Sequence, residues 1–551
     1  MEMVFDYVIV GGGSAGCVLA NRLSECGQFQ VCLIEAGGKD NSIFIKMPCA
    51  VGVPLVTPKF TWAFESEPEV HLNGRRIFSP RGRVIGGCSS INGMVYMRGH
   101  PLDFDEWEKS GAEGWGYSNV LPYFKKAECR ADGGNDWRGA HGPLNTRYGT
   151  LSNPLYSAFI NAAKEAGYAE SDDLNGYRQE GFGRFDMTVH NGTRWSTAAA
   201  YLHPVTKRKN LQVLHNAVVT KINVVNGVAE SVNVVESGVK RAIAARREVI
   251  LSSGPINSPK ILLLSGIGDS EHMRSVGIEP VHHLPGVGKN LQDHISLYVQ
   301  VKCKKPVTLN AISHVAKAKL GARWLLRRDG LGATNHFECG GFIRSKAGLK
   351  YPDIEIHFLP VAVRDKGHPQ AKEHGFQVDV GTTKSKSVGH VLLASNDPME
   401  APKISYNYLS NSDDWREMRA CVRLVREIIR QPALSLYAGE ELIPGVHVQT
   451  DDEINDFIAQ NAQSGFHPSG TCKMGHSSDP MAVVNSSLQV IGVQHLRVVD
   501  SSVMPTITNA NLNAPTIMIA EKAADLILNR PLLKPEQVDY FIHENWMTEQ
   551  R

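Results

Sequence analysis

The first forty residues alternate between apolar runs and polar or glycine-rich breaks. Residues 7–10 (YVIV) and 30–34 (QVCLI) are short apolar runs, which are typical of buried strands. Between them, residues 17–23 carry apolar side chains at helical spacing. The order of strand, turn, helix and strand predicts a Rossmann-like βαβ unit at the start of the chain.

Similar patterns recur far along the sequence. Residues 215–222 and 248–251 are predicted to be strands, and the alternation at residues 353–358 predicts strand there as well. Residues 516–528 have helical periodicity, with Pro515 in the first turn. No stretch approaches 18 uninterrupted apolar residues, so the pattern predicts no membrane-spanning helix.

The break after the first strand, GGGSAG at residues 11–16, matches the G-x-G-x-x-G motif in its required context of strand, turn and helix. Gly11 permits the tight turn, Gly13 lets a pyrophosphate approach the backbone, and Gly16 lets the helix pack on the strand. The second strand ends at Glu35, which can accept hydrogen bonds from a ribose diol. These features predict a dinucleotide site. A purely structural turn is the alternative, and the motif alone does not separate FAD from NAD.

Composition and charge exclude other classes of protein. At 551 residues the chain implies about two to four structural units. The 58 basic and 56 acidic residues give a net charge of +2, which offers no global reason to bind nucleic acid. Its ten cysteines form no C-x-x-C pair, so we expect no metal site and a reduced protein. With no signal-like N-terminal segment, we expect a cytoplasmic location, and peripheral attachment to the inner membrane stays open.

A second glycine-rich stretch lies at residues 80–93 (PRGRVIGGCSSING). Small residues suit a backbone that passes close to a flat ring, although by spacing alone the stretch could be an ordinary loop. It resembles the first signature of the glucose–methanol–choline (GMC) oxidoreductases, a family of FAD-dependent alcohol oxidisers. Residues 254–268 resemble the second signature of that family. Residues 466–475 and 496–516 resemble its C-terminal part.

Within the family, residues 172–183 and 335–344 resemble the bacterial choline dehydrogenases most closely. The resemblance implies FAD-dependent oxidation of a primary alcohol by hydride transfer to flavin N5. It further implies choline as the substrate, betaine aldehyde as the product on the way to glycine betaine, and a membrane quinone of the respiratory chain as the electron acceptor. An uncharged aliphatic, aryl or polyether alcohol is the main alternative substrate. A lyase or light-driven decarboxylase of the same fold and a non-catalytic flavin module are more distant alternatives.

The resemblance also implies a mixed α/β (α+β) fold of two domains and a tail. The Rossmann-like FAD-binding domain would be discontinuous, and the substrate domain would be an antiparallel sheet with helices. The implied segments are 1–148, 210–296 and 481–531 for the FAD-binding domain, 149–209 and 297–480 for the substrate domain, and 532–551 for the tail.

The implied FAD contacts gather in the two glycine-rich stretches, near the second signature and at the start of the last helix. They are Gly11, Gly13, Ser14, Ala15, Gly16, Glu35, Ala36, Trp62, Arg83, Val84, Gly87, Ser89, Asn92, Gly93, Met94, Val95, Val218, Ser253, Gly254, Asp500, Asn513, Pro515 and Thr516. Choline oxidases carry a histidine that bonds covalently to the flavin at the position of Ile91. Because isoleucine has no nucleophilic atom, the resemblance implies non-covalent FAD.

The resemblance assigns the chemistry to His467 and Asn513. Alcohol oxidation needs a base for the hydroxyl proton and a second polar group that orients the oxygen. His467 would be the base and Asn513 its partner, at a position that is histidine in some family members. Trp62, Phe466 and Glu338 would bind the substrate, because aromatic faces and a carboxylate recognise a trimethylammonium group. Packing near the flavin is the alternative for the two rings, and a surface or interface charge is the alternative for Glu338.

Overall fold

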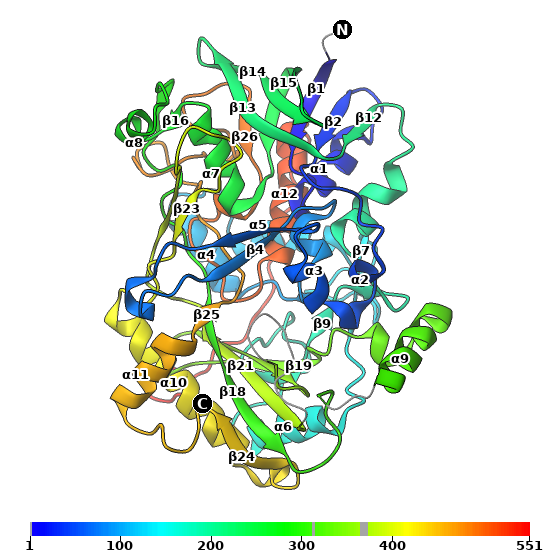
Figure 1. Cartoon of the computed structure of the whole chain (residues 1–551), viewed down its shortest axis with the longest axis vertical. Helices are drawn as coiled ribbons and strands as arrows, with labels where there is room; N and C mark the ends of the chain where they lie inside the picture. The colour runs from blue at the N-terminus through cyan, green and yellow to red at the C-terminus, as the bar shows by residue number, and fades with distance from the viewer. Residues whose placement is uncertain (1–2, 311–313, 364–372) are drawn as a thin grey trace.

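Two β-sheets lie one above the other along the longest axis of the molecule (Figure 1). The computed structural model describes residues 3–310, 314–363 and 373–551. One sheet is mixed and includes the first strands of the chain, and the other is antiparallel. The predicted fold class, a Rossmann-like part joined to an antiparallel sheet with helices, is therefore confirmed.

The upper sheet in Figure 1 has seven strands. The strand β1 runs parallel to β2 and β15, β12 runs parallel to β2, and β26 runs parallel to β15. The strands β13 and β14 form an antiparallel extension on β15. In order across the sheet, the strands are β12 (Leu211–Leu214), β2 (Val31–Ile34), β1 (Met3–Val10), β15 (Val239–Leu251), β14 (Val228–Glu236) and β13 (Ala217–Val225), with β26 (Leu496–Val498) on β15.

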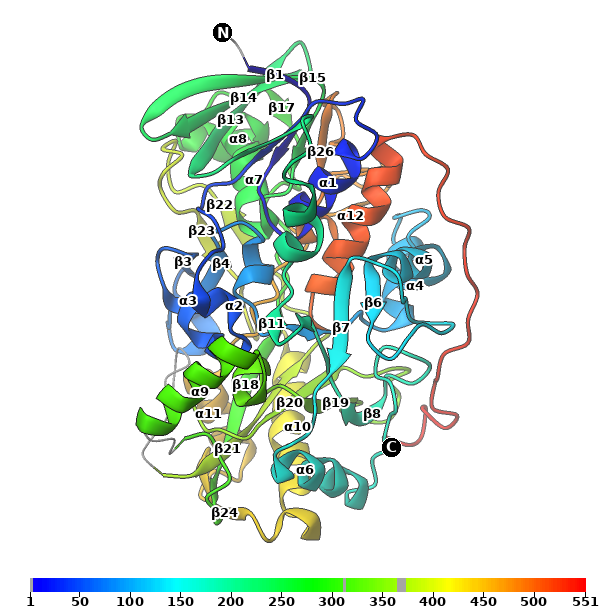
Figure 2. The ribbon, with the colours of Figure 1, turned by 90° about the vertical axis from the view of Figure 1, so that its right-hand side faces the viewer.

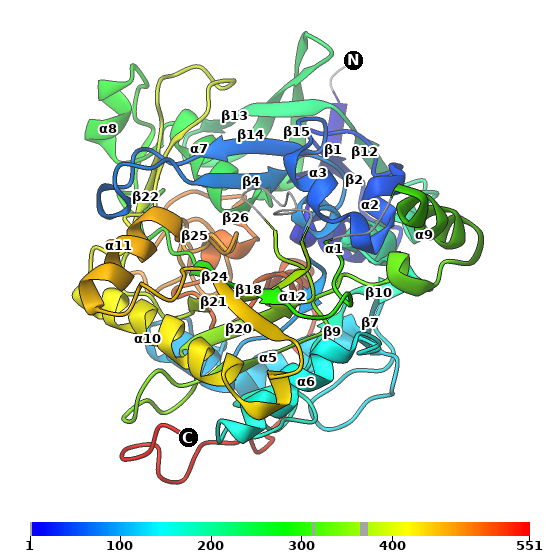
Figure 3. The same cartoon turned by 60° about the horizontal axis from the view of Figure 1, so that its bottom comes forward.

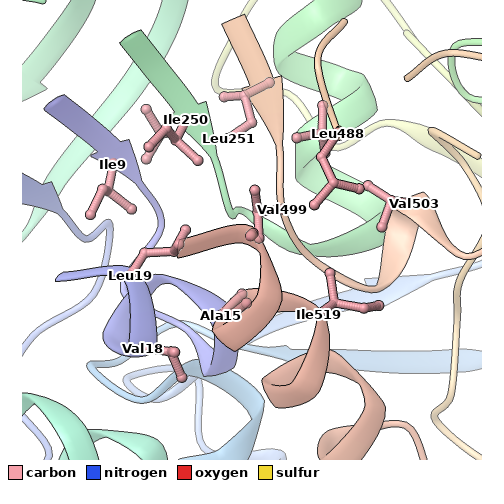
Figure 4. Packing of buried hydrophobic residues seen from close by; sticks show 14 of the residues in the cluster. Ile9, Ala15, Val18, Leu19, Ile250, Leu251, Leu488, Val499, Val503 and Ile519 are labelled. Carbon is pink, nitrogen blue, oxygen red and sulfur yellow. The ribbon is translucent and has the colours of Figure 1, made fainter. Parts of the chain in front are cut away.

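Two helices from opposite ends of the chain, α1 (Ser14–Ser24) and α12 (Asn513–Ile527), pack together in the core of this sheet (Figure 4). A Cβ on Gly16 would lie 1.9 Å from the carbonyl oxygen of Gly11, so only glycine lets α1 start this close to β1. Asn513 Nδ2 donates a 2.9 Å hydrogen bond to Ser14 Oγ. Because these are the first residues of their helices, both N-termini meet at one place.

The lower sheet is antiparallel throughout, and its strands alternate between two environments. Ile354, Ile356 and Phe358 are buried in the core that the sheet forms with the helices α6 (Pro154–Glu165) and α10 (Ser412–Ile429), which lie in front of it in Figure 3. The intervening Glu355 and His357 face the opposite side. The strands are β19 (Cys339–Ile343), β20 (Ile354–Leu359), β21 (Gly375–Thr382), β18 (Ile295–Cys303) and β24 (Ala438–Ile443), with β25 (Gln463–Ser464) on β18.

The other helices and strands surround these two sheets. The helices are α2 (Ile43–Lys46), α3 (Gly52–Val56), α4 (Pro101–Lys109), α5 (Tyr117–Ala127), α6 (Pro154–Glu165), α7 (Gly254–Leu264), α8 (Ser270–Ser275), α9 (His314–Arg327), α10 (Ser412–Ile429) and α11 (Asp451–Asn461). The shorter strands include β3 (Thr61–Glu65) with β4 (Phe78–Gly82), and a small sheet of β5 (Val95–Tyr96), β9 (Asp186–Met187), β7 (Leu144–Tyr148) and β6 (Glu128–Arg130). Within the described ranges, none of the helices combines the length and the apolar character needed to cross a bilayer.

The secondary structure predicted from the sequence pattern is confirmed, with small shifts of the ends. The strands predicted at residues 215–222 and 248–251 fall in β13 and β15, and the alternation at residues 353–358 falls in β20. The predicted last helix is α12, which begins three residues earlier than residue 516. The domain boundaries stay predictions. Ala198–Leu202, inside the segment 149–209, packs in the core of the upper sheet.

The polar tail at residues 532–551 runs down the outside of the molecule from the end of α12 toward the lower sheet (Figure 2). Trp137 Nε1 donates to the carbonyl of Asp539 at 2.9 Å, and the Arg178 guanidinium lies 3.9 Å from the centre of the Phe541 ring. Near the end, Arg344 Nη1 donates to the carbonyl of Glu549 at 2.7 Å. The tail therefore has specific contacts with both halves of the molecule.

Candidate active site

A cavity of about 1030 Å³ lies between the two sheets. This volume lies just above the ~300–1,000 Å³ range of ligand pockets. The two glycine-rich loops line one side, and the strands β18, β20 and β21 line the other. His467 lies at the junction, together with Asn511 and the start of α12. The cavity therefore joins a dinucleotide loop to a set of polar side chains.

Backbone contacts between the two glycine-rich loops form one wall of the cavity. Gly11 has a φ of +104°, in the left-handed region that favours glycine. A Cβ on Gly87 would lie 2.7 Å from the Cα of Gly13, so the two loops touch backbone to backbone. Gly86 N donates to the carbonyl of Gly12 at 2.7 Å. The wall is bare peptide, which a pyrophosphate or a flat ring can approach closely.

Glu35 lies just after β2 and lines the cavity next to this wall. Its carboxylate accepts hydrogen bonds from Gly12 N at 2.8 Å and from Gly37 N at 2.7 Å. Burial raises the pKa of Glu35 to about 7, while the two backbone hydrogen bonds and Arg83 act in the opposite direction. A carboxylate has about four acceptor sites, so Glu35 keeps the capacity to bind a ribose diol.

Arg194 supports the second glycine-rich loop from behind. Its guanidinium donates to the carbonyls of Ile45 at 2.9 Å and Asn92 at 2.7 Å, and to Asn92 Oδ1 at 2.8 Å. Burial lowers the pKa of Arg194 to about 9. Ser89 Oγ donates to the carbonyl of Gly86 at 2.6 Å. The sequence pattern carried no signal for Arg194, because its partners lie far from it along the chain.

Most of the residues predicted to bind FAD line the cavity, and five do not. Those that line it are Gly11, Gly13, Ser14, Ala15, Glu35, Ala36, Trp62, Gly87, Asn92, Gly93, Met94, Val95, Val218, Ser253, Gly254, Asp500, Asn513 and Thr516. The other five are Gly16, Arg83, Val84, Ser89 and Pro515. Gly16 packs on β1, and Arg83 lies over the Trp62 ring at 4.5 Å. Gly16 and Arg83 therefore contact cavity-lining residues without lining the cavity themselves.

His467 takes part in a chain of hydrogen bonds that determines which ring nitrogen carries its proton. His294 Nε2 lies 2.9 Å from the carbonyl of Thr508, which can only accept, so His294 is protonated at Nε2. His294 Nδ1 then accepts from His467 Nδ1 at 2.9 Å. The second nitrogen of His467, Nε2, is left unprotonated, and Asn511 Nδ2 donates to it at 3.1 Å. His467 therefore presents a basic nitrogen to the cavity.

Both histidines are neutral in this environment. Burial lowers the pKa of His294 to about 3. Burial also holds the pKa of His467 well below its usual value, with smaller contributions from His294, His357 and Arg81. A neutral imidazole can accept a proton, whereas an imidazolium cannot.

Asn511, rather than Asn513, is the asparagine that contacts His467. Asn513 Nδ2 donates to Ser14 on the dinucleotide loop, so the partner role predicted for Asn513 is corrected. The physical reason is the helix start: Asn513 is the first residue of α12, whereas Asn511 lies in the preceding turn. His357 of β20, which the sequence analysis did not identify, also bonds to the Asn511 side chain, and burial lowers its pKa to about 4.

The backbone next to His467 is held in an unusual conformation. Phe466 has a φ of +64°, which a non-glycine residue rarely adopts. His467 N donates to Asp293 Oδ1 at 2.7 Å, and Arg81 Nη2 donates to the Phe466 carbonyl at 2.9 Å. Tyr408 OH donates to the other oxygen of Asp293 at 2.5 Å. These bonds fix the turn that carries His467.

The residues predicted to bind a substrate cation do not all reach the cavity. Trp62 and Phe466 line it. Glu338 does not. It is 1% exposed, and its carboxylate accepts from Leu151 N and from Thr334 Oγ1, both at 2.6 Å. The predicted contact of Glu338 with substrate is corrected, because its carboxylate instead connects the segments of Leu151 and Thr334 through hydrogen bonds. Among the described residues, no three histidine, cysteine or acidic side chains are grouped so that they could hold a metal ion.

The fold and the cavity define a dinucleotide-dependent oxidoreductase whose reacting groups lie between a nucleotide-binding sheet and an antiparallel sheet. Residues 5–296 match the N-terminal GMC oxidoreductase domain, and residues 385–520 match the C-terminal one. The chain belongs to the GMC oxidoreductase family. It is an FAD-dependent oxidoreductase, as the resemblance implied.

Known proteins resemble this chain along its whole length. An oxygen-dependent choline dehydrogenase of Vibrio vulnificus (strain YJ016) is 52% identical over 554 residues, covering 100% of this chain and 99% of that protein. One from Brucella ovis is 50% identical over 550 residues, with 100% of both covered. The crystal structure of pyridoxine 4-oxidase from Mesorbium loti matches with a TM-score of 0.87 and 30% identity, covering 96% of this chain and 99% of that one.

The residues present fit FAD. Gly13 and Gly87 lie so close together that a side chain on Gly87 would collide with Gly13, so the wall can consist only of backbone. Glu35 keeps acceptor sites that a ribose can use. The N-termini of α1 and α12 lie close together on the same side of the cavity, and such termini favour the negative charge of phosphate or of a reduced ring.

Proposed function

We propose that this enzyme oxidises choline to betaine aldehyde, the step that leads to glycine betaine, with His467 as the base. The observation that carries the chemistry is the hydrogen-bond chain from Thr508 through His294 to His467, which leaves Nε2 of His467 as an acceptor 3.1 Å from Asn511 Nδ2 in the wall of the FAD cavity. The choice of choline rests on relatives about half identical along their full length, which are named choline dehydrogenases.

In this proposal the hydroxyl proton of the alcohol passes to Nε2 of His467. Asn511 donates its Nδ2 hydrogen to the alcohol oxygen and stabilises the charge that develops there. The hydrogen bond from His467 Nδ1 to His294 holds the ring in the required tautomer. FAD, when bound, accepts the hydride. Asn513 holds the dinucleotide side through Ser14 and takes no part in proton transfer.

FAD is held without a covalent bond in this proposal. Ile91, at the position of the flavin-linked histidine of choline oxidases, lines the cavity with an aliphatic side chain. Acid precipitation of the holoenzyme should therefore release all of the flavin into the supernatant. Yellow colour that stays with the precipitated protein would contradict non-covalent binding.

The proposed electron acceptor is a quinone of the inner membrane, reached by peripheral attachment of a cytoplasmic protein. The helix α9 supports this assignment, because Lys317 and Leu320 line the cavity while Leu325 and Leu326 are exposed on the same helix. The helix carries four lysines and arginines and no acidic residue, as expected for a helix that contacts anionic lipid.

Vesicle binding tests this part of the proposal. Leu326→Glu should weaken binding of the holoenzyme to vesicles that contain anionic lipid. Val239→Glu, at an exposed valine on the far hairpin, is the matched control and should bind as the wild type does. Equal binding of the two variants would contradict attachment through α9.

Anaerobic reduction of the flavin across a panel of alcohols tests the substrate. Choline should bleach the flavin faster than hexanol or benzyl alcohol. A choline rate no better than that of hexanol would instead favour an uncharged alcohol as the substrate. Full turnover by His467→Ala would refute the base assignment.

A further inference from the structure

The cavity face of the antiparallel sheet carries two carboxylates that none of the steps above uses. Glu355 on β20 and Asp379 on β21 both line the cavity. Asp379 pairs directly with His357 across the β20–β21 ladder and with Tyr298 across the β18–β21 ladder. Glu355 lies two residues before His357 on the same face of β20. The two acids therefore flank the histidine that bonds to Asn511.

Each acid has one carboxylate oxygen without a hydrogen-bond partner, although a hydrogen bond from Ser296 acts to lower the pKa of Asp379. Glu355 is 5% exposed, and its Oε1 accepts no hydrogen bond. Asp379 Oδ1 likewise has no hydrogen-bond partner. Glu355 Oε1 lies 3.4 Å from His357 Nε2, without hydrogen-bond geometry. Across the described segments, no lysine or arginine forms an ion pair with either acid.

Other polar atoms in the same cavity are also without partners. Thr383, which is 1% exposed, lines the cavity, and its hydroxyl makes no hydrogen bond. The same holds for the hydroxyl of Thr382. Buried polar groups are rarely left unpaired in folded proteins, so orphaned atoms grouped around one cavity indicate a ligand that satisfies them.

The electrostatics of the pair point to a positive ligand. Burial raises the pKa of Asp379 to about 7 and holds that of Glu355 well above its usual value, with repulsion from Asp379 adding to the effect on Glu355. His357, with a pKa of about 4, stays neutral and supplies no counter-charge. A cation bound between the acids would remove the cost of burying their charge.

We infer that Glu355 and Asp379 bind the cationic nitrogen of the alcohol substrate, the task that the sequence had assigned to Glu338. This inference rests on the proposed function for the position of the hydroxyl group at His467 and Asn511. His357 Nε2 lies 3.4 Å from Glu355 Oε1, and His357 pairs with Asp379 on the next strand. The His357 side chain also interacts with Asn511, so the nitrogen lies a short distance from the reacting carbon. The substrate class is therefore short amino alcohols. Because carboxylates accept hydrogen bonds, alcohols with N–H ammonium groups bind this pair as well as quaternary ones do.

Calorimetric titration of the holoenzyme with tetramethylammonium, a cation that cannot be oxidised, tests the pair. Glu355→Gln and Asp379→Asn should each weaken its binding by about 10-fold or more, because each removes a buried counter-charge. Because the raised pKa values of the two acids favour their neutral forms in the absence of a cation, replacing either by the neutral amide should leave folding and FAD content unchanged. If Glu355→Gln fails to fold, Asp379→Asn carries the test alone.

Two controls separate charge in the cavity from other effects. Glu417 on α10 is another acid whose pKa is raised to about 7 by burial, and it does not line the cavity. Glu417→Gln should bind tetramethylammonium as the wild type does. Glu338→Gln should do so as well. Unchanged binding in the variants of Glu355 and Asp379, or a loss confined to Glu338→Gln, would overturn the inference.

Steady-state kinetics with a charged and an uncharged substrate distinguish a failure of this inference from a failure of the proposed function. With choline, the same two variants should raise KM by about 10-fold or more, whereas KM for its neutral isostere 3,3-dimethyl-1-butanol should change little. An equal rise for both substrates would overturn the inference. If the wild type binds tetramethylammonium through the pair but does not oxidise choline, the proposed function fails and the cation site stands.

Discussion

Replacing each of the two asparagines near the start of α12 separately by alanine tests the geometry of the site most directly. Asn511 and Asn513 are two residues apart in the sequence but face different groups: Asn511 Nδ2 lies 3.1 Å from His467 Nε2, and Asn513 Nδ2 lies 2.9 Å from Ser14 Oγ. Asn511→Ala removes the donor next to the base and leaves the contact with the dinucleotide loop intact. Asn513→Ala does the reverse.

The magnitude follows from the role of each donor. A hydrogen-bond donor directed at an oxygen that becomes negative in the transition state is worth about 10²–10³ in kcat, or about 2.7–4 kcal/mol. We therefore expect Asn511→Ala to lower kcat by about 10²–10³ with normal FAD content. Asn513→Ala loses one neutral hydrogen bond, worth about 0.5–1.5 kcal/mol, and that loss should weaken FAD binding while kcat of the loaded enzyme changes little.

Stopped-flow reduction of the flavin measures the chemical step, and the flavin-to-protein absorbance ratio measures FAD content. Asn511→His supplies an internal check, because a histidine at this position can also donate to the alcohol oxygen, and it should recover much of the lost rate. A slow chemical step in Asn513→Ala together with a normal one in Asn511→Ala would refute the assignment. It would return the catalytic role to Asn513.

Three further outcomes are expected. Burial holds the pKa of His467 well below 6.5, so the base stays unprotonated as pH falls from about 8 to about 6. We therefore expect kcat/KM for 3,3-dimethyl-1-butanol to be independent of pH over that range. A fall in kcat/KM near neutral pH whose midpoint shifts in His294→Ala would contradict this. Gly87→Ala should abolish FAD binding, because its Cβ would meet Gly13 at 2.7 Å, whereas Gly27→Ala, with a similar positive φ and open space, should bind FAD normally. Removing residues 532–551 should lower the free energy of unfolding by about 2–5 kcal/mol, because hydrogen bonds and ring contacts are lost. Urea denaturation of the holoenzyme measures this change. An unchanged midpoint of the urea transition would show that the tail does not contribute to stability.

The elements that the sequence predicted best are those set by local pattern. The strand, glycine loop and helix at residues 7–23 follow from apolar spacing and from the need for glycine where Gly16 meets Gly11, so they could be identified without a structure. Arg194 and His294 could not, because each acts on groups brought close only by the fold. No spacing in the sequence connects Arg194 to Asn92 or His294 to His467.

The error at Glu338 has a geometric cause. The segment before β19 is not a regular strand: Asn335, His336 and Phe337 all line the cavity, and His336 has a φ of +64°. Phe337 lines the cavity, and the next residue, Glu338, points away from it toward Leu151 and Thr334. A motif identifies the segment but does not determine which of two adjacent residues faces the ligand. On β20, by contrast, the regular alternation of a strand places the side chain of Glu355 in the cavity, which is why that acid, and not the one in the family motif, is positioned to meet a cation.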